Sequence, residues 1–248
     1  MIVCAGLATR DTIYAVPRHP GADDRVVATE RLVAGGGPAA TAAVTIARLG
    51  VPVRFVGAVD ELEGVEVVRV PGRTVESTIL VSGAERAIVT EEPPPLEIPA
   101  VALEGGDWLH VDQLGYPAVP PGSGLLLSVD AGNPIDGLEP ERADLYAPTE
   151  STFDGRRGKT TVVTRGAGGC IAYAGEETIA VPAFEGVEIV STLGAGDVFH
   201  GALLACLVRG LELRDALVRA TACAALSCRA LDGRAAIPTW DELERSIA

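Results

Sequence analysis

Short runs of consecutive apolar residues recur along the chain and predict buried strands. They are rich in Val, Leu or Thr, and they lie at residues 53–59, 108–112, 125–130 and 161–165. The amino-terminal residues that follow Met1 form another such run. Apolar strands without polar alternation are typical of a parallel sheet that is covered on both faces.

Other segments repeat apolar residues every three or four positions, which predicts helices among the strands. The predicted helices lie at residues 38–49, 198–209 and 213–230. The first begins with Pro38 and ends at Gly50, which are the usual start and stop residues of a helix. A last helix opens with Thr239 and Glu242 at the spacing of a capping box. We therefore expect an α/β fold with a doubly wound, mostly parallel sheet.

Two segments, about 12–34 and 74–92, do not fit this alternation of strands and helices. They contain stretches of alternating polar and apolar residues, at 26–33, 78–82 and 87–90, with no helix between them. Alternation of this kind predicts antiparallel strands that are more exposed than the main sheet. We expect these strands to form a small β-sheet lid over one edge of a cleft, within a single domain of residues 1–248.

Several connections between the predicted parallel strands are short. Residues 61–71, 116–124 and 152–158 leave no room for a full crossover helix, which normally needs about a dozen residues. Part of one sheet face should therefore be thinly covered. Because an open apolar face or an unpaired lid edge usually becomes an interface, we expect a homo-oligomer, with a homodimer as the commonest outcome.

Composition excludes several classes of function. The net charge of −14 comes from scattered acids, which argues against a nucleic-acid partner. No apolar stretch approaches the roughly 18 residues of a membrane span, and the amino terminus reads as a strand instead of a signal peptide. The five cysteines show no metal-binding spacing, so we expect reduced, mostly buried thiols in a cytoplasmic protein.

The segment 191–201, Ser-Thr-Leu-Gly-Ala-Gly-Asp-Val-Phe-His-Gly, carries the strongest chemical signal and leads straight into an apolar helix. Gly194 and Gly196 allow a ligand to approach the backbone closely, and a helix amino terminus is a ready site for an anion. Asp197 has a simpler interpretation as well, because an acid in the first turn of a helix is stabilised by the helix dipole. Taken alone, this segment favours helix capping over catalysis.

The wider pattern resembles the ribokinase-like (PfkB) carbohydrate kinases. Their carboxy-terminal signature, D-T-x-G-A-G-D, is similar to residues 191–197, and their amino-terminal glycine pair is similar to residues 35–43, Gly-Gly-Gly-Pro-Ala-Ala-Thr-Ala-Ala. The segments 164–169 and 233–238 follow in family order. The residues of the two signature motifs look nearest to those of the sulfofructose kinase and ketohexokinase members of the family. The resemblance spans essentially the whole chain and implies a trimmed ribokinase-like fold that transfers phosphate from ATP, with Mg²⁺, to a hydroxyl group.

The resemblance also implies roles for individual residues. Asp197 would be the catalytic base, and the backbone N–H groups of Gly194, Ala195 and Gly196 would form the anion hole for the transferred phosphate. Substrate binding would fall to Asp11, Gly35, Gly36 and Thr41, and the nucleotide phosphates would be bordered by Thr164, Gly166 and Gly169. Glu150 would help to hold Mg²⁺, through water.

Four departures from the family pattern bear on function. Thr41 stands where many members have Asn, which concerns the choice of sugar, and Ala147 replaces the Asn that accompanies the magnesium-organising acid. Ser191 replaces an acid that helps to bind potassium in some members, which puts activation by a monovalent cation in doubt. No basic residue for a sulfonate follows the strand at 108–112, so we expect an uncharged small sugar or polyol as substrate.

Other interpretations remain open from the sequence. The same fold also phosphorylates nucleosides, and the shortened connections, Ala147 and Ser191 fit a non-catalytic sugar- or nucleotide-binding relative. Without the family context, Asp11 could be a turn-capping residue and Glu150 a solvated loop acid. His200 is interpreted as a surface or packing residue because Asp197 already fills the role of base, and His19 and His110 carry no signal.

Overall fold

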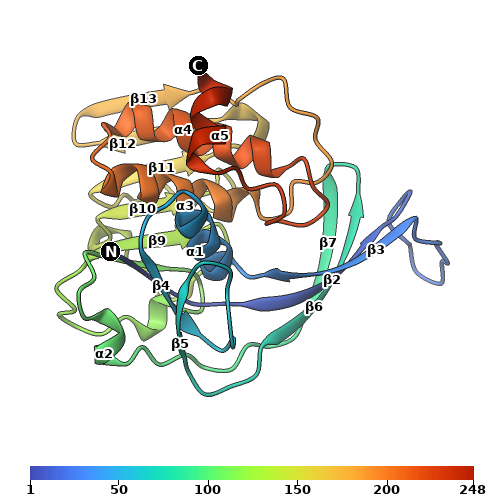
Figure 1. Ribbon diagram of the computed structural model, residues 1–248, viewed down its shortest axis with the longest axis horizontal. Coiled ribbons are helices and arrows are strands. Elements are labelled where there is room, and N and C mark those ends of the chain that lie inside the picture. Colours follow the sequence, from blue (N-terminus) through green and yellow to red (C-terminus); the bar gives the residue numbers. More distant parts are fainter.

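The computed structural model describes residues 1–248 and contains two sheets (Figure 1). The large sheet has nine strands in the order β13-β12-β11-β10-β9-β8-β1-β4-β5. These strands are β1 (Ile2–Ala5), β4 (Val53–Gly57), β5 (Glu66–Arg69), β8 (Trp108–Val111), β9 (Leu126–Ala131), β10 (Leu145–Pro148), β11 (Thr160–Thr164), β12 (Cys170–Ala174) and β13 (Glu177–Val181). All neighbours are parallel except β12, which runs antiparallel to both β11 and β13. The predicted fold class is confirmed.

Side chains of β1 alternate between two apolar cores, one on each face of the large sheet. Ile2 and Cys4 belong to the larger core, which also contains residues of the four long helices. Val3 and Ala5 point into the smaller core on the opposite face. All four are fully buried, which explains why the strand reads as one continuous apolar run.

The helices are distributed unequally between these two faces. The helices α1 (Pro38–Arg48), α3 (Ala195–Val208), α4 (Leu213–Ser227) and α5 (Trp240–Ile247) cover one face and lie in front of the sheet in Figure 1. The opposite face has α2 (Ala100–Leu103) and the single 3₁₀ turns η1 (Tyr116–Ala118) and η2 (Pro140–Arg142). The prediction of shortened crossovers and a thinly covered face is therefore correct. None of the helices has the length and apolar character that crossing a membrane requires.

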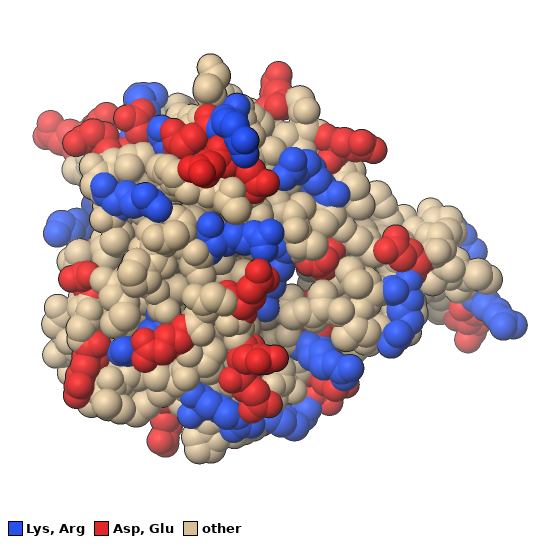
Figure 2. All heavy atoms as spheres, in the orientation of Figure 1, with Lys and Arg blue, Asp and Glu red and all other residues tan.

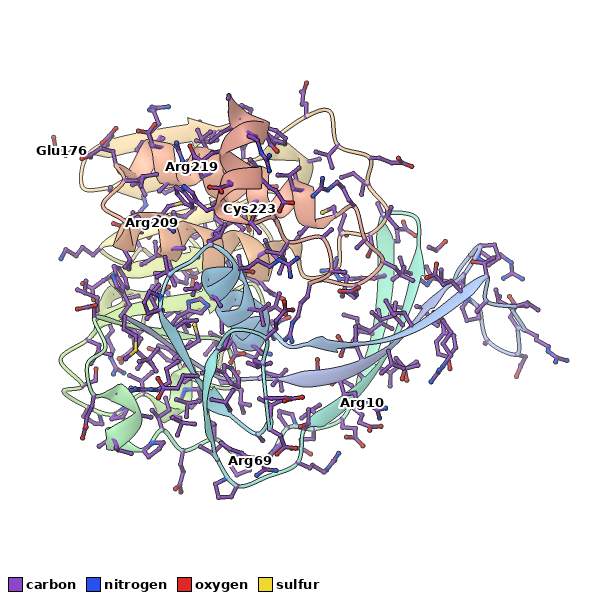
Figure 3. The ribbon with its side chains drawn as sticks, viewed as in Figure 1. Arg10, Arg69, Glu176, Arg209, Arg219 and Cys223 are labelled. Atoms are coloured by element: carbon purple, nitrogen blue, oxygen red, sulfur yellow. The ribbon has the colours of Figure 1, made fainter.

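Contacts made by arginines fasten the carboxy-terminal helices to the rest of the helical layer. Arg219 of α4 forms a bidentate pair with Glu244 of α5, and Arg209 lies 4.1 Å above the Trp240 ring (Figure 3). The predicted capping box of α5 is present, because Thr239 and Glu242 exchange hydrogen bonds between side chain and backbone. The start of α5 is thus set locally, and its position is set by α3 and α4.

The small sheet, here called the lid sheet, contains β2 (Thr9–Ala15), β3 (Glu30–Gly36), β6 (Val75–Ser82) and β7 (Glu85–Thr90), in the order β3-β2-β6-β7. It projects from the main body in Figure 1. One expectation needs correction, because β2 and β6 pair in parallel, and only the outer pairs are antiparallel. Alternation of polar and apolar residues reports one-sided burial and does not report strand direction, so it could not separate the two arrangements.

Three boundaries also differ from the sequence predictions. Residues 26–29 are not in a strand, since β3 begins at Glu30, and Val27 keeps 78% of its surface exposed. The helix predicted for 213–230 ends at Ser227. Residues 66–69, within one short connection, form an edge strand that pairs with β4. All five cysteines are free and buried, as expected.

Charged side chains of both signs are spread over the surface. On the face shown in Figure 2, acidic and basic residues are interspersed on the main body and on the projecting lid. The excess of acids is therefore not gathered into one patch on that face, and exposed pairs such as Arg10–Glu76 on the lid join opposite charges.

Candidate active site

The amino terminus of α3 lies at an opening in the structure. Gly194 precedes the helix with φ 75°, and a Cβ atom there would lie 2.9 Å from Cα of Gly233. Gly196 differs, because no atom lies within 4 Å of the position that its Cβ would take. No side chain caps this helix. The N–H of Ala195 donates to the carbonyl of Thr192 at 3.3 Å, whereas the open space at Gly196 leaves the backbone there accessible to a ligand, which suits an anion.

Asp197 lies in the first turn of α3, among other charged groups. Burial of its carboxyl group raises its pKa to about 7, and the nearby Asp130 adds to the effect, whereas His200 opposes it. The residue as a whole keeps a part of its surface exposed. A carboxyl group with such a pKa can accept a proton near neutral pH, as a general base must.

Asp11 of β2 is buried beside the glycines that precede α1. A Cβ atom at Gly36 would lie 2.0 Å from Oδ2 of Asp11, so only glycine allows this approach. Oδ1 of Asp11 is buried without a hydrogen-bond partner, and burial raises the pKa of this carboxyl group. An unpaired buried acceptor is costly unless a ligand satisfies it, so this atom points to a binding role.

Arg234 completes this side of the site, and the sequence analysis gave it no role. Its Nη2 donates a 2.6 Å hydrogen bond to the carbonyl of Gly36, and its Nε donates to Oγ1 of Thr41 at 3.1 Å. A Cβ atom at Gly35 would lie 2.5 Å from Nη1. Burial lowers the pKa of Arg234 to about 10, against the opposing influence of Asp11 and Asp197. The expected substrate residues are therefore brought together around one arginine.

Asp112 fixes the loops beneath this pocket and was also missed. It is fully buried at the end of β8, and its two oxygens accept hydrogen bonds from the backbone N–H groups of Leu7, Ala39, Leu114 and Gly115 at 2.8–3.2 Å. Burial raises the pKa of this carboxyl group, and the N–H donors act against the rise. Its position directly after a predicted parallel strand was the available signal.

The lid sheet reaches the segment that precedes the anion site. Nη1 of Arg86, on β7, donates to Oγ1 of Thr192 at 3.3 Å, and that hydroxyl donates to the carbonyl of Ala84 at 3.1 Å. The hairpin between β6 and β7 therefore lies against the loop before α3. Arg86 is the second cationic residue near Asp197 that sequence reasoning did not identify.

The expected nucleotide residues lie at the carboxyl ends of β10 and β11. The N–H of Glu150 donates to the carbonyl of Thr164 at 2.9 Å, which joins the two segments. Gly169 has φ 77°, and a Cβ atom there would lie 2.1 Å from the carbonyl oxygen of Val181. Gly166 has φ 52° and open space around its Cβ position. This is the edge of the sheet at which α/β proteins usually bind ligands.

A magnesium ion would find few protein ligands here. The carboxylate of Glu150 is exposed and forms no ion pair, and no three acidic, histidine or cysteine residues form a metal cage. This donor set fits a Mg²⁺ ion that keeps most of its waters and binds nucleotide phosphates, which is the usual mode for this ion.

Comparisons with known proteins agree with this geometry. Residues 145–240 match the family model of the pfkB family carbohydrate kinases. The ATP-dependent ribose-1-phosphate kinase of Halopiger xanaduensis is 24% identical, with 97% of this chain and 95% of that protein covered. The 2-dehydro-3-deoxygalactonokinase of Haloferax volcanii is 41% identical over 89 residues, which cover 36% of this chain and 27% of that protein. Over residues 145–240 the chain thus resembles the pfkB family carbohydrate kinases.

The solved structures extend this result to the whole fold. The ribokinase of Thermotoga maritima superposes with a TM-score of 0.78 at 23% identity, with 100% of this chain and 99% of that chain covered. The predicted resemblance to ribokinase-like PfkB kinases is thus confirmed. The residues 145–240 that match the family model include both Asp197 and Arg234.

The sequence left His200 as a surface or a packing residue, and the structure excludes the surface position. His200 is not on the surface: it is 5% exposed, and its Nδ1 lies 2.8 Å from Oδ2 of Asp130. His110 is also buried, and its ring centroid lies 6.2 Å from that of His200. Neither histidine could be placed from the sequence, because their partners come from other strands.

Proposed function

We propose that this protein transfers the γ-phosphoryl group of ATP to a hydroxyl group of a small sugar or polyol. The observation that carries the proposal is the position of Asp197, one residue after the open backbone of Gly194–Gly196. A base and an anion site are thereby held side by side at one helix end. Phosphoryl transfer needs this combination of positioning and charge stabilisation and little further chemistry.

The proposed reaction uses Asp197 as general base. The carboxylate of Asp197 accepts the proton of the acceptor hydroxyl while the hydroxyl oxygen forms a bond to the γ-phosphorus. The bond between the γ-phosphorus and the oxygen that bridges to the β-phosphate breaks, and ADP leaves. The N–H groups of Gly194, Ala195 and Gly196 stabilise the charge on the transferred group.

The remaining residues orient the two substrates. The unpaired Oδ1 of Asp11 would accept a hydrogen bond from a sugar hydroxyl in the pocket bounded by Gly35, Gly36 and Thr41. Thr164, Gly166 and Gly169 border the nucleotide phosphates. Mg²⁺, held through Glu150 and water, would neutralise phosphate charge.

A nucleoside is the second candidate acceptor. The nucleoside kinase of Methanocaldococcus jannaschii superposes with a TM-score of 0.80 at 18% identity, with 99% of this chain and 97% of that chain covered. A nucleoside also presents ribose hydroxyls, so the same base and anion site would serve. A non-catalytic relative would keep ligand binding and lose turnover.

ADP release from MgATP, measured over a panel of sugars, polyols and nucleosides, tests these candidates. Asp197→Asn should keep nucleotide binding, measured by calorimetry, and lose a factor of roughly 10² or more in turnover, as expected for a positioned base. Turnover within a few-fold of wild type would remove Asp197 from the role of base. No turnover with any acceptor, despite binding, would favour the non-catalytic relative.

A further inference from the structure

A buried pair of charged residues lies directly behind Asp197. His200 is one helical turn after Asp197 on α3, and Asp130 is the fifth residue of β9. Nδ1 of His200 and Oδ2 of Asp130 are 2.8 Å apart, and both side chains are 6% exposed. The other carboxylate oxygen of Asp130, Oδ1, accepts a hydrogen bond from the N–H of Gly132 at 2.8 Å, which fixes the side chain.

A buried ion pair of this kind rarely adds stability, because removing two charges from water costs about as much as their attraction returns. The neighbouring His110 offers a comparison, because it is a buried histidine with an uncharged ring. Its Nδ1 lies 3.0 Å from Oγ of Ser128, and burial lowers its pKa to about 4, so the ring is neutral. The two adjacent buried imidazoles thus differ in their partners, because His110 faces a hydroxyl group and His200 faces the carboxylate of Asp130.

Charges of both signs face Asp197 from the surrounding elements. Asp130 on β9 and Asp112 just after β8 disfavour its ionised form, whereas His200 on α3 and Arg86 on β7 favour it. Arg234 approaches from the loop before α5. Burial acts against a charged His200, but Asp130 and Asp197 outweigh burial and raise the pKa of His200. The raised pKa of His200 and the lowered pKa of Asp130 both favour an ionised pair, with Asp130 as the anion.

We propose that His200 is a positioning residue that keeps Asp197 available as a base, because its positive charge cancels the buried negative charge of Asp130. The proposal rests on the proposed role of Asp197. Without the imidazolium, the carboxylates of Asp130 and Asp197 would face each other at low dielectric, and Asp197 would retain its proton. His200 itself neither gains nor loses a proton during the transfer.

The test measures the titration of Asp197 in the free protein by ¹³C NMR of labelled aspartate carboxyl groups, with Asp197→Asn to assign the signal. His200→Asn keeps an amide donor near Asp130 and removes the charge. In this variant we expect the titration midpoint of the Asp197 carboxyl group to rise by roughly one pH unit, which is a tenfold change in its proton affinity. His110→Asn is the matched control, because it replaces a neutral ring at the same depth, and its midpoint should stay at the wild-type value.

The double variant His200→Asn/Asp130→Asn separates charge from structure. It removes both members of the pair, so the Asp197 midpoint should return toward the wild-type value, whereas a purely structural role predicts no such rescue. An unchanged midpoint in His200→Asn would overturn the proposal.

If His200→Asn does not fold, ¹⁵N NMR of the wild-type rings decides. The chain has only three histidines, and His200 should carry protons on both ring nitrogens at pH 7. A neutral His200 ring would also overturn the proposal. Loss of the proposed function is recognised separately, by turnover in Asp197→Asn.

Discussion

Arg234 joins two signature segments that are 198 residues apart, through the 2.6 Å hydrogen bond from its Nη2 to the carbonyl of Gly36. The same guanidinium binds Thr41, and its charge acts to lower the pKa of the buried carboxyl group of Asp11. The proposed acceptor pocket is therefore bounded by a residue from the loop before the last helix. Its shape depends on that loop as much as on the glycines.

Arg234→Met should damage binding of the acceptor more than binding of ATP. The substitution keeps an unbranched but shorter side chain, removes the donors to Gly36 and Thr41, and leaves Asp11 without its cationic neighbour. We expect the KM for the acceptor to rise roughly tenfold or more, since a lost hydrogen bond to a charged group is worth about 1.5–3 kcal/mol. Arg229→Met, on the same loop but exposed, is the control. An effect on ATP binding alone would assign Arg234 to the nucleotide instead.

The two glycines of the anion site should respond in opposite ways to substitution. Gly194→Ala places a Cβ atom 2.9 Å from Gly233 at a positive φ, so we expect a loss of stability of about 1–2 kcal/mol, measured by urea unfolding. Gly196→Val enters open space, so the fold should tolerate it while ATP binding weakens, as calorimetry would show. Unchanged ATP affinity and turnover in Gly196→Val would remove the anion-site interpretation.

Asp197→Asn should make the protein more stable at pH 8. The folded-state pKa of about 7 lies above the ordinary value, so the folded protein prefers protonated Asp197 and loses stability as the pH rises through 7. An uncharged Asn avoids this loss, for a gain of about 1–3 kcal/mol, allowing for the partial exposure of the residue. Thermal melts should show a higher Tm, by roughly 2–4 °C per kcal/mol. The gain should shrink as the pH is lowered from 7 toward 4, and a constant gain would contradict the raised pKa.

A homodimer through the lid sheet is the expected assembly. Strand β7 is an exposed edge, and Val89 and Ile88 keep 74% and 49% of their surfaces exposed. Such edges are usually buried by pairing with another chain. Light scattering should give about twice the chain mass of 25.5 kDa, and Val89→Glu should restore the monomer. Val101→Glu, on the thinly covered face and 63% exposed, is the matched control; dissociation by that variant alone would move the interface to this face.

The sequence by itself determined the features that depend on neighbouring residues. Pro38 and Gly50 bound α1, the capping box starts α5, and the apolar runs give the parallel strands of the large sheet. The segment 191–197 places Asp197 and its glycines at a helix start for the same reason, because spacing along one helix fixes their relation. The class of fold followed from these local signals, whereas the role of Asp197 as candidate base came from the resemblance to the PfkB kinases.

Only the tertiary structure decided which distant residues meet. The parallel pairing of β2 with β6, the contact of Arg234 with Thr41 across 193 residues, and the pairing of His200 with Asp130 across 70 residues have no local signal. A histidine in an apolar helix pattern reads as a packing residue until its partner is known. Whether a buried group is charged depends on the atoms that surround it, and those atoms come from strands and loops that only folding brings together.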